Sequence, residues 1–219
     1  MRKLFIYCAG GVGREVCDIA VRANDKKSQW DEICFIDDTK EQGWFYDRRV
    51  YPYKSFVKLF SSSDAEIVIA NGEPSARENI SHKILSDGYE LANVIDITAV
   101  ISPAVRIGRG IILYPFVCVS SNADIKNNVL IYNQSTVAHD SMIGKNSVLS
   151  IGVTVAGRCR IHENCFIGAG SVIREKVEVG EWSIVSMGSV VYRSVEKNGI
   201  YTGNPARLKR ENNDRIVFK

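Results

Sequence analysis

Residues 131–161 have the sequence IYNQSTVAHDSMIGKNSVLSIGVTVAGRCRI, in which isoleucine, leucine or valine recurs at every sixth position. The same spacing runs without a break from Ile101 to Val191, and all sixteen residues on it are aliphatic. A period of six fits neither an α-helix nor a single alternating strand. Hexapeptide repeats are typical of β-helices, whose stacked coils share one continuous core.

A second inward position follows four residues after each aliphatic one. It holds either Val or Ile or a small residue, and the small ones are Ala123, Ser135, Ser141, Ser147, Cys159, Cys165, Ser171, Ser183 and Ser189. Three hexads are expected to close one triangular coil, giving about five coils spaced roughly 4.8 Å apart. The glycines at the second place of a hexad are expected in turns that need positive φ: Gly108, Gly144, Gly168 and Gly180.

The composition is that of an ordinary globular protein. The chain has 219 residues, 45% of them hydrophobic and 24% charged, enough for one large or two small domains. The net charge of +3 comes from scattered residues, which argues against a nucleic-acid partner. No apolar run is long enough for a membrane span, and the first residues do not resemble a signal peptide, so a cytoplasmic location is expected. The six cysteines show no C-x-x-C pairing and are expected to be reduced thiols.

Strands and helices are predicted to alternate before the repeat. Strands are expected at residues 3–9, 33–36 and 66–70, and helices at residues 14–23 and 74–86. This alternation predicts a short parallel sheet. The sequence thus predicts a Rossmann-like α/β domain at residues 1–94, a parallel β-helix at residues 95–195 and a C-terminal tail at residues 196–219.

Three polar or glycine-rich tips follow the predicted strands: Gly10, Gly11, Val12 and Gly13 after the first, Asp37 and Asp38 after the second, Asn71 and Gly72 after the third. Ligands of parallel sheets bind beyond these carboxyl ends, where a glycine turn admits phosphate and a carboxylate accepts from ribose or base. A nucleotide fits. The G-x-G-x-x-G fingerprint is absent because Cys8 takes the place of its first glycine, which argues against NAD. In the alternative interpretation, the glycines form a tight turn and the aspartates cap a loop.

The chain has only three histidines, His82, His139 and His162. His82 lies in a predicted helix, and His162 takes a hexad position that suits a surface turn. His139 faces outward and is followed directly by Asp140. An unperturbed histidine has a pKa of about 6.5, so His139 is a candidate general base, although an isolated surface histidine is usually inert. A catalytic zinc site needs three protein ligands, and His139 and His162 lack a third, so no metal is expected.

With these motifs, the whole chain resembles the bacterial left-handed β-helix acetyltransferases that act on sialic acid (O-acetylation) or on nucleotide-linked amino sugars (N-acetylation). The resemblance rests on Cys8-Ala9-Gly10-Gly11-Val12-Gly13, Phe35-Ile36-Asp37-Asp38, Val137-Ala138-His139-Asp140 and Gly203-Asn204-Pro205-Ala206-Arg207. It implies a left-handed helix, His139 as general base and Asp140 as the residue that tunes it.

The resemblance also implies the ligands. The glycine turn and acidic pair would hold a nucleotide sugar, and acetyl-CoA would lie between subunits of a homotrimer, beside Val148, Ala169, Met187 and Gly188. Many family members carry histidines where this chain has Val12 and Val148, and often Asn where it has Tyr132. These departures leave the sugar open.

The predicted function is acetyl-CoA-dependent N-acetylation of a nucleotide-linked amino sugar for bacterial surface glycans. The phosphate-binding glycine turn together with Asp37 and Asp38 favours it. The alternatives are sugar O-acetylation of the sialic-acid type and a non-catalytic nucleotide-sugar-binding module.

Overall fold

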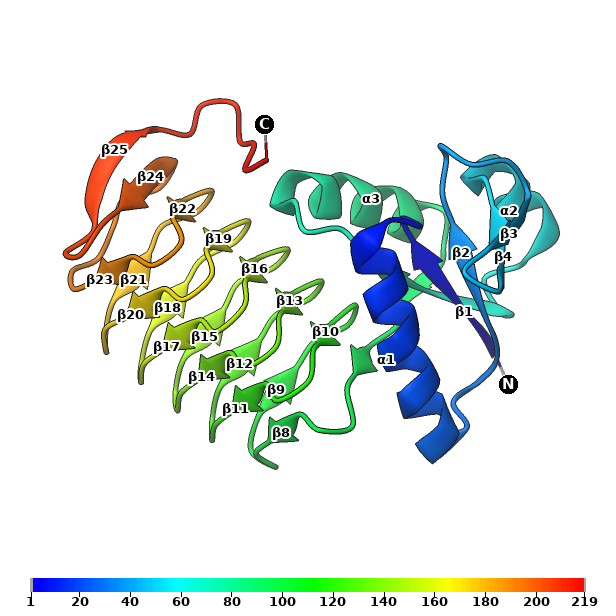
Figure 1. Ribbon diagram of the computed structural model, residues 1–219, viewed down its shortest axis with the longest axis horizontal. Helices are drawn as coiled ribbons and strands as arrows, with labels where there is room; N and C mark the ends of the chain where they lie inside the picture. Colours follow the sequence, from blue (N-terminus) through cyan, green and yellow to red (C-terminus); the bar gives the residue numbers. More distant parts are fainter. Residues whose placement is uncertain (1, 219) are drawn as a thin grey trace.

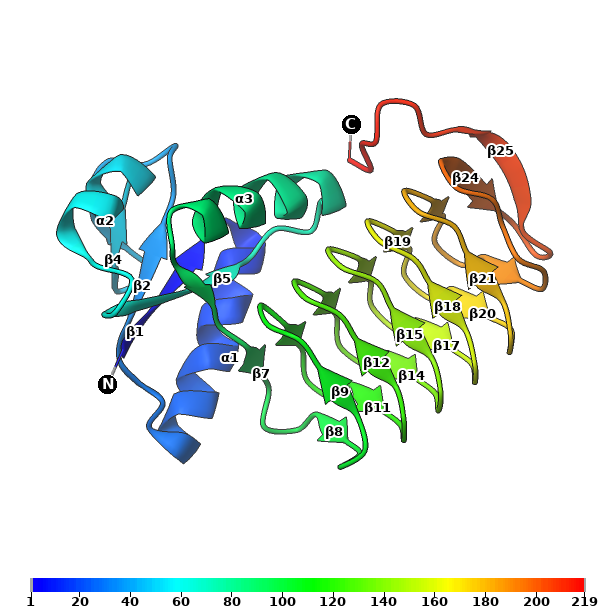
Figure 2. The ribbon, with the colours of Figure 1, turned by 180° about the vertical axis from the view of Figure 1, so that it is seen from behind.

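The computed structural model describes residues 2–218, which form an α/β domain packed beside one end of a three-sided prism (Figure 1). The two parts meet along one face of the prism, and the C-terminal segment returns from the far end of the prism toward helix α3, as both views show (Figure 2). No helix in this part of the chain is long and apolar enough to cross a membrane.

The α/β domain is a six-stranded sheet in the order β3-β4-β2-β1-β5-β6, parallel except for β3. Its strands are β1 (Arg2–Tyr7), β2 (Trp30–Ile36), β3 (Gly43–Phe45), β4 (Arg48–Tyr51), β5 (Ala65–Ile69) and β6 (Glu90–Leu91). Its helices are α1 (Gly11–Lys27), α2 (Tyr53–Leu59) and α3 (Pro74–Ser86). The three predicted strands and both predicted helices are present. The β3-β4 hairpin and α2 were not predicted.

The prism has three parallel sheets, each pairing residues that are 18 apart in sequence, as Cys118 pairs with Thr136. The first face consists of β7 (Val94–Ile95), β10 (Ile112–Leu113), β13 (Leu130–Ile131), β16 (Val148–Leu149), β19 (Phe166–Ile167), β22 (Ile184–Val185) and β24 (Gly199–Thr202), with β25 (Arg207–Glu211) antiparallel beyond them. The second face consists of β8 (Val100–Ile101), β11 (Cys118–Val119), β14 (Thr136–Val137), β17 (Thr154–Val155), β20 (Val172–Ile173) and β23 (Val190–Val191). The third face consists of β9 (Arg106–Ile107), β12 (Asp124–Ile125), β15 (Met142–Ile143), β18 (Arg160–Ile161) and β21 (Glu178–Val179).

Both inward positions of the repeat are buried, as the period of six predicts. The aliphatic series fills the interior, and most of its members are completely buried. The small residues at the second inward position also form hydrogen bonds between coils. The Ser135 hydroxyl donates to the Ser150 carbonyl at 2.8 Å, and the Ser141 hydroxyl donates to the Ala156 carbonyl at 2.9 Å. These bonds tie each coil to the next and satisfy hydroxyl groups that would otherwise be costly to bury.

The expected positive φ at Gly108, Gly144, Gly168 and Gly180 is wrong. Positive φ occurs two residues later in the hexad, for example at Asn146 (59°) and Gly170 (67°). The four glycines are needed for a different reason, because the next coil lies against them. A Cβ at Gly144 would lie 2.4 Å from the carbonyl carbon of His162, a separation that real Cβ atoms do not reach.

Arg77 of α3 fastens the α/β domain to the prism. Its guanidinium is fully buried and donates to the Ile69 carbonyl (2.6 Å), the Asn71 carbonyl (3.0 Å), and the carbonyl and side-chain oxygens of Asn128. Burial lowers the pKa of Arg77 to about 10. A ladder of buried asparagine amides continues from Asn128 to Asn146 at 2.8 Å and on along the corner. The strand tip before Asn71 therefore has a fixed position relative to the coils.

Candidate active site

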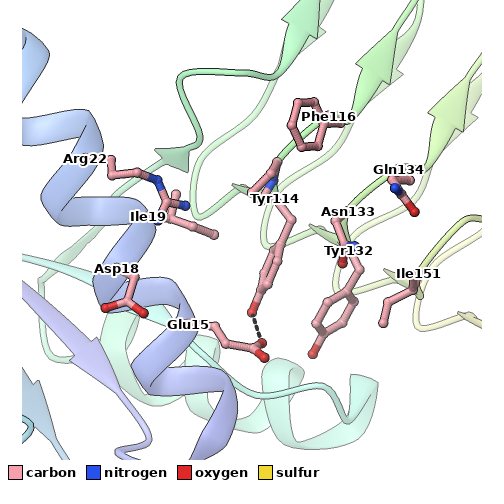
Figure 3. Close-up of a pocket in the computed structure, with 11 residues that line it drawn as sticks. Glu15, Asp18, Ile19, Arg22, Tyr114, Phe116, Tyr132, Asn133, Gln134 and Ile151 are labelled. Atoms are coloured by element: carbon pink, nitrogen blue, oxygen red, sulfur yellow. Dashed lines mark hydrogen bonds between the residues drawn. The ribbon is translucent and has the colours of Figure 1, made fainter.

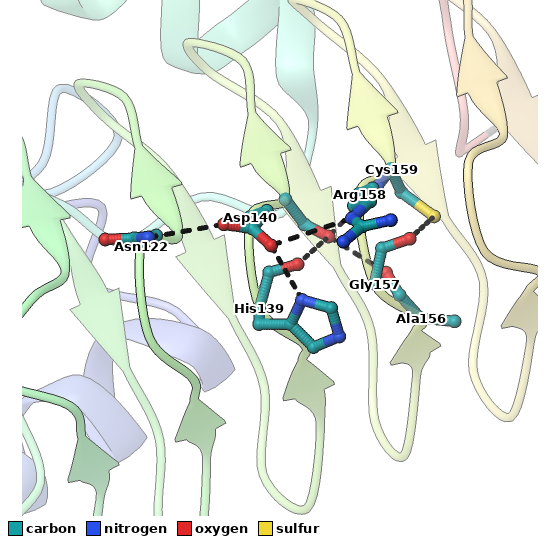
Figure 4. A network of polar contacts seen from close by, with 8 residues as sticks. Asn122, His139, Asp140, Ala156, Gly157, Arg158 and Cys159 are labelled. Atoms are coloured by element: carbon teal, nitrogen blue, oxygen red, sulfur yellow. Dashed lines mark hydrogen bonds and ion pairs between the residues drawn. The ribbon is translucent and has the colours of Figure 1, made fainter.

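His139 and Asp140 lie at the corner between the second and third faces of the prism (Figure 4). Asp140 has φ of 59°, a left-handed conformation that aspartate tolerates better than most residues. The turn places its Oδ2 atom 2.8 Å from His139 Nδ1. With Nδ1–H donating to the carboxylate, the ring presents Nε2 as a proton acceptor on a side chain that is 58% exposed.

Neighbouring coils hold the Asp140 carboxylate. Asn122, one coil before, donates to Oδ1 at 3.3 Å, and Nε of Arg158, one coil later, lies 3.8 Å from Oδ2 (Figure 4). The hydrogen bond with His139, followed by that from Asn122, lowers the pKa of Asp140. Asp140 therefore stays ionised near neutral pH and is able to stabilise a protonated imidazole beside it.

Gly157 faces the histidine from the next coil, a position that was not predicted from the sequence. A Cβ at this position would lie 2.8 Å from His139 Nε2, so only glycine fits without displacing the ring. Within residues 2–218 the Gly157 N–H donates to no acceptor. The glycine whose Cβ position faces the basic nitrogen thus also carries a backbone N–H without a partner among the described residues. Stepping 18 residues from His139 would have found it.

A cleft of about 680 Å³ lies between the α/β domain, the first face of the prism and the C-terminal segment. Gly11, Val12 and Gly72 line one side, and Ala169 and Met187 line the other. Five predicted binding residues from distant parts of the sequence therefore share one cleft. The lining residues that sequence reasoning missed are Glu15, Ser150, Ile151, Phe166, Gly168, Ile184, Ser186, Val217 and Phe218, together with Tyr132, which it noted only as a departure from the family.

The remaining predicted binding residues lie outside the cleft lining. Gly10 precedes α1, Gly188 follows Met187 in the same turn, and Val148 on β16 is completely buried. Asp37, Asp38 and Asn71 occupy the strand tips.

A second hollow of about 410 Å³ adjoins the cleft and shares Glu15, Tyr132 and Ile151 with it (Figure 3). The Tyr114 hydroxyl donates to Glu15 Oε2 at 2.9 Å, and the Tyr114 and Tyr132 rings pack with centroids 4.6 Å apart. Burial raises the pKa of Tyr132 to about 12, so its hydroxyl remains a neutral donor. The hollow thus combines two carboxylates, Glu15 and Asp18, with aromatic walls.

The three strand tips converge, as predicted, but the chain's own donors occupy the aspartates. Asp37 accepts from the Ala9 N–H at 2.7 Å and from Thr39, and Asp38 accepts from the Tyr53 N–H and the Tyr7 hydroxyl at 2.8 Å each. Burial alone would raise the pKa of Asp37, but the bonds from Thr39 and Ala9 outweigh it and lower the pKa. These bonds agree with the alternative interpretation, in which the aspartates cap a loop.

The histidine and the cleft lie on different edges of the prism. Ala169 and Met187 belong to the corner between the first and second faces, whereas His139 belongs to the corner between the second and third. The whole width of the second face separates them within one chain. Among residues 2–218, no group of three His, Cys, Asp or Glu side chains is arranged to hold a metal ion.

Two protein families match parts of the chain. Residues 3–84 match the PglD N-terminal domain, and residues 158–193 match the bacterial transferase hexapeptide (six repeats). The first covers the sheet with the glycine turn, and the second covers coils of the prism beyond His139.

Solved structures resemble the chain over almost its full length. WeeI from Acinetobacter baumannii AYE is 30% identical, with 95% of this chain and 100% of that chain covered and a TM-score of 0.87. The acetyltransferase domain of PglB from Neisseria gonorrhoeae FA1090 is 27% identical, with 95% and 100% covered and a TM-score of 0.88, and has also been solved with acetyl coenzyme A. PerB from Caulobacter crescentus, solved with CoA and GDP-perosamine, is 23% identical, with 96% and 98% covered and a TM-score of 0.87, and its likeness shows the fold.

Proposed function

Because the chain belongs to the PglD-type family of hexapeptide-repeat sugar acetyltransferases, we propose that it transfers acetyl from acetyl-CoA to the amine of a nucleotide-linked amino sugar. The observation that carries this proposal is the exposed His139–Asp140 pair, which presents a basic nitrogen at a corner of the prism. General-base chemistry at neutral pH needs such a nitrogen.

In the proposed reaction, the sugar amine attacks the thioester carbon and His139 Nε2 accepts the proton that the nitrogen loses. A C–N bond forms, the C–S bond breaks, and the proton passes to the departing CoA thiolate. Asp140 stabilises the imidazolium in between, at 2.8 Å from Nδ1. The free N–H of Gly157 is a suitable donor for the thioester oxygen as negative charge develops there.

We assign the ligands by the chemistry of the cleft walls. Gly10, Gly11 and Val12 form the turn at the start of α1, where backbone amides favour phosphate, and Gly72 lies opposite. We assign the nucleotide sugar to this side. Asp37, Asp38 and Asn71, at the neighbouring strand tips, fix the shape of this side of the cleft. The prism side carries Ala169, Met187 and Gly188, and Val148 is buried beneath this surface. We assign acetyl-CoA to this side.

We propose a homotrimer, because one chain does not bring His139 to the cleft. The outward residues of the second face carry no charge: Val100, Cys118, Thr136, Thr154, Val172 and Val190. By contrast, four of the five outward residues on the third face are charged: Arg106, Asp124, Arg160 and Glu178. Three copies packed around an axis beside their second faces would place the His139 corner of one protomer against the Ala169 corner of the next.

We also propose a cytoplasmic location. All six cysteines are free thiols, which suits a reducing compartment.

Thiol release from acetyl-CoA tests the proposed function. The panel comprises UDP-, dTDP- and GDP-linked amino sugars, the same nucleotides with the corresponding hydroxy sugars, and free sialic acid. Turnover only with amino sugars supports N-acetylation. Turnover with sialic acid or hydroxy sugars would replace it by O-acetylation, and nucleotide binding without any thiol release would indicate a non-catalytic module.

A further inference from the structure

The C-terminal segment runs back along the molecule toward the cleft. After β25, Asn212 is buried, and its Nδ2 donates to the Trp182 carbonyl at 2.8 Å. The guanidinium of Arg215 then lies 4.5 Å from the centre of the Trp182 ring. Figure 2 shows this segment passing above the coils of the prism toward α3. Residues 213–218 are here called the strap.

Glu73 holds the far end of the strap. Its Oε2 accepts from two consecutive backbone N–H groups, those of Val217 (2.9 Å) and Phe218 (3.1 Å). Glu73 directly follows Gly72, which lines the cleft. A carboxylate that accepts two such bonds forms a stronger anchor than a neutral acceptor would.

The strap supplies part of the cleft wall. Val217 and Phe218 both line the cleft, and the Phe218 ring meets the Phe166 ring edge to face at 5.3 Å. On its other side, Phe218 lies 3.7 Å from the Cβ position of Gly72. Phe218 is 61% exposed, so part of its ring remains open to a molecule in the cleft.

We propose that the strap is a wall of the nucleotide-sugar side of the cleft, with Phe218 as the contact to the ligand and Glu73 as the positioning residue that holds it. The proposal rests on the proposed function, in which that side of the cleft takes the nucleotide sugar. Phe218 lies between Phe166 of the prism and Gly72 of the α/β domain, and Glu73 holds the strap from the Gly72 side, so we assign the effect of the strap to the nucleotide sugar.

Four variants of the full chain test the strap by steady-state kinetics. Glu73→Ala and Phe218→Ala should raise KM for the nucleotide sugar roughly tenfold, the equivalent of one lost contact of ordinary size, with kcat within about twofold and KM for acetyl-CoA unchanged. Glu73→Gln keeps an acceptor and should fall between wild type and Glu73→Ala. Leu208→Ala, which removes an exposed side chain on β25, should match wild type.

A second readout follows the strap directly. Trypsin cleaves after Arg215, and Glu73→Ala should speed that cleavage while added nucleotide sugar slows it in wild type. Faster cleavage together with a lower KM would mean that the strap blocks the cleft, and an unchanged KM would remove its role; either result overturns the proposal.

Binding of the nucleotide sugar, measured in the His139→Ala chain with and without Glu73→Ala, separates the two proposals. Acetylation is measured in the parent chain, which keeps His139. If no amino sugar is acetylated by the parent chain but Glu73→Ala still weakens binding, the strap stands and the acetyl-transfer proposal fails. If the parent turns over and Glu73→Ala leaves both KM and binding unchanged, only the strap fails.

Discussion

Gly157 lies one coil beyond His139, at a distance where a single added methyl group would stand 2.8 Å from the imidazole Nε2. The spacing of the coils, rather than any direct bond, therefore fixes the room available to the basic nitrogen. A change of one atom at residue 157 is thus expected to act on chemistry rather than on folding.

Gly157→Ala should lower kcat roughly 10–100-fold, because the histidine ring must move from its position beside Asp140. The melting temperature should change little, since residue 157 lies in an outer turn. Gly43→Ala, where an added Cβ meets nothing within 4 Å, is the matched control. Activity at the wild-type level in Gly157→Ala would contradict the assigned position of the ring.

His139→Ala should lower kcat by on the order of 10²–10⁴, the usual contribution of a general base. His162→Ala removes the other histidine of the prism and should leave kcat unchanged. In wild type the rate should rise between pH 6 and pH 8, whereas the profile of His139→Ala should follow loss of the proton from the attacking amine alone. Equal pH profiles in both chains would argue against proton transfer to His139.

Arg77→Ala should destabilise the fold by roughly 3 kcal/mol or more, because several buried carbonyl groups, including those of Asn128 and Ile69, lose their donor. Urea unfolding measures this change. Arg193→Ala at an exposed position should stay within about 0.5 kcal/mol of wild type. A loss that small for Arg77→Ala would show that the interface does not depend on this guanidinium.

Asp37→Asn should lower stability at pH 7 by roughly 1 kcal/mol, since the partly exposed carboxylate accepts three bonds from Ala9 and Thr39. The folded-state pKa is below the ordinary aspartate value of about 3.9, so this stabilisation is present above that value and is lost as the pH falls through the folded-state pKa. Urea unfolding at pH 7 and at pH 3 should therefore show a gap that narrows in acid. The exposed Glu41→Gln is the control, and a gap independent of pH would contradict the role of the charge.

Thr154→Arg should break the proposed trimer, because it puts three like charges near the axis on the uncharged second face. Sedimentation equilibrium should give the mass of the 24.4 kDa chain for this variant and about three times that for wild type. Acetyl transfer should fall with assembly. Met142→Arg, on the third face, should remain trimeric; a trimeric Thr154→Arg would move the interface to another face.

The prism was predictable because one short-range rule, an aliphatic residue at every sixth position, holds for the whole of residues 101–191. The glycine turn and α3 followed from equally local signals, and α3 has the predicted bounds. The role of Gly144 was misjudged because its constraint comes from His162, a full coil away, which no local turn rule contains.

The candidate site was predictable only in part. His139 and Asp140 are adjacent in sequence, so their pairing required no knowledge of the fold. The Tyr114–Glu15 bond joins residues that are 99 apart, and the Glu73 anchor joins residues more than 140 apart. Such contacts depend on how the sheet packs against the coils, and neither composition nor periodicity carries that information.

The 18-residue pitch of the ladder has a consequence for how such chains diversify. Gain or loss of one whole coil leaves every strand paired, whereas gain or loss of a single hexad would rotate all later residues onto the neighbouring face. Viable descendants are therefore restricted to lengths that differ by whole coils, and the spacing between the sheet domain and the reactive corner changes in increments of roughly 4.8 Å. The length of the prism is therefore expected to change in evolution only in discrete steps of one coil.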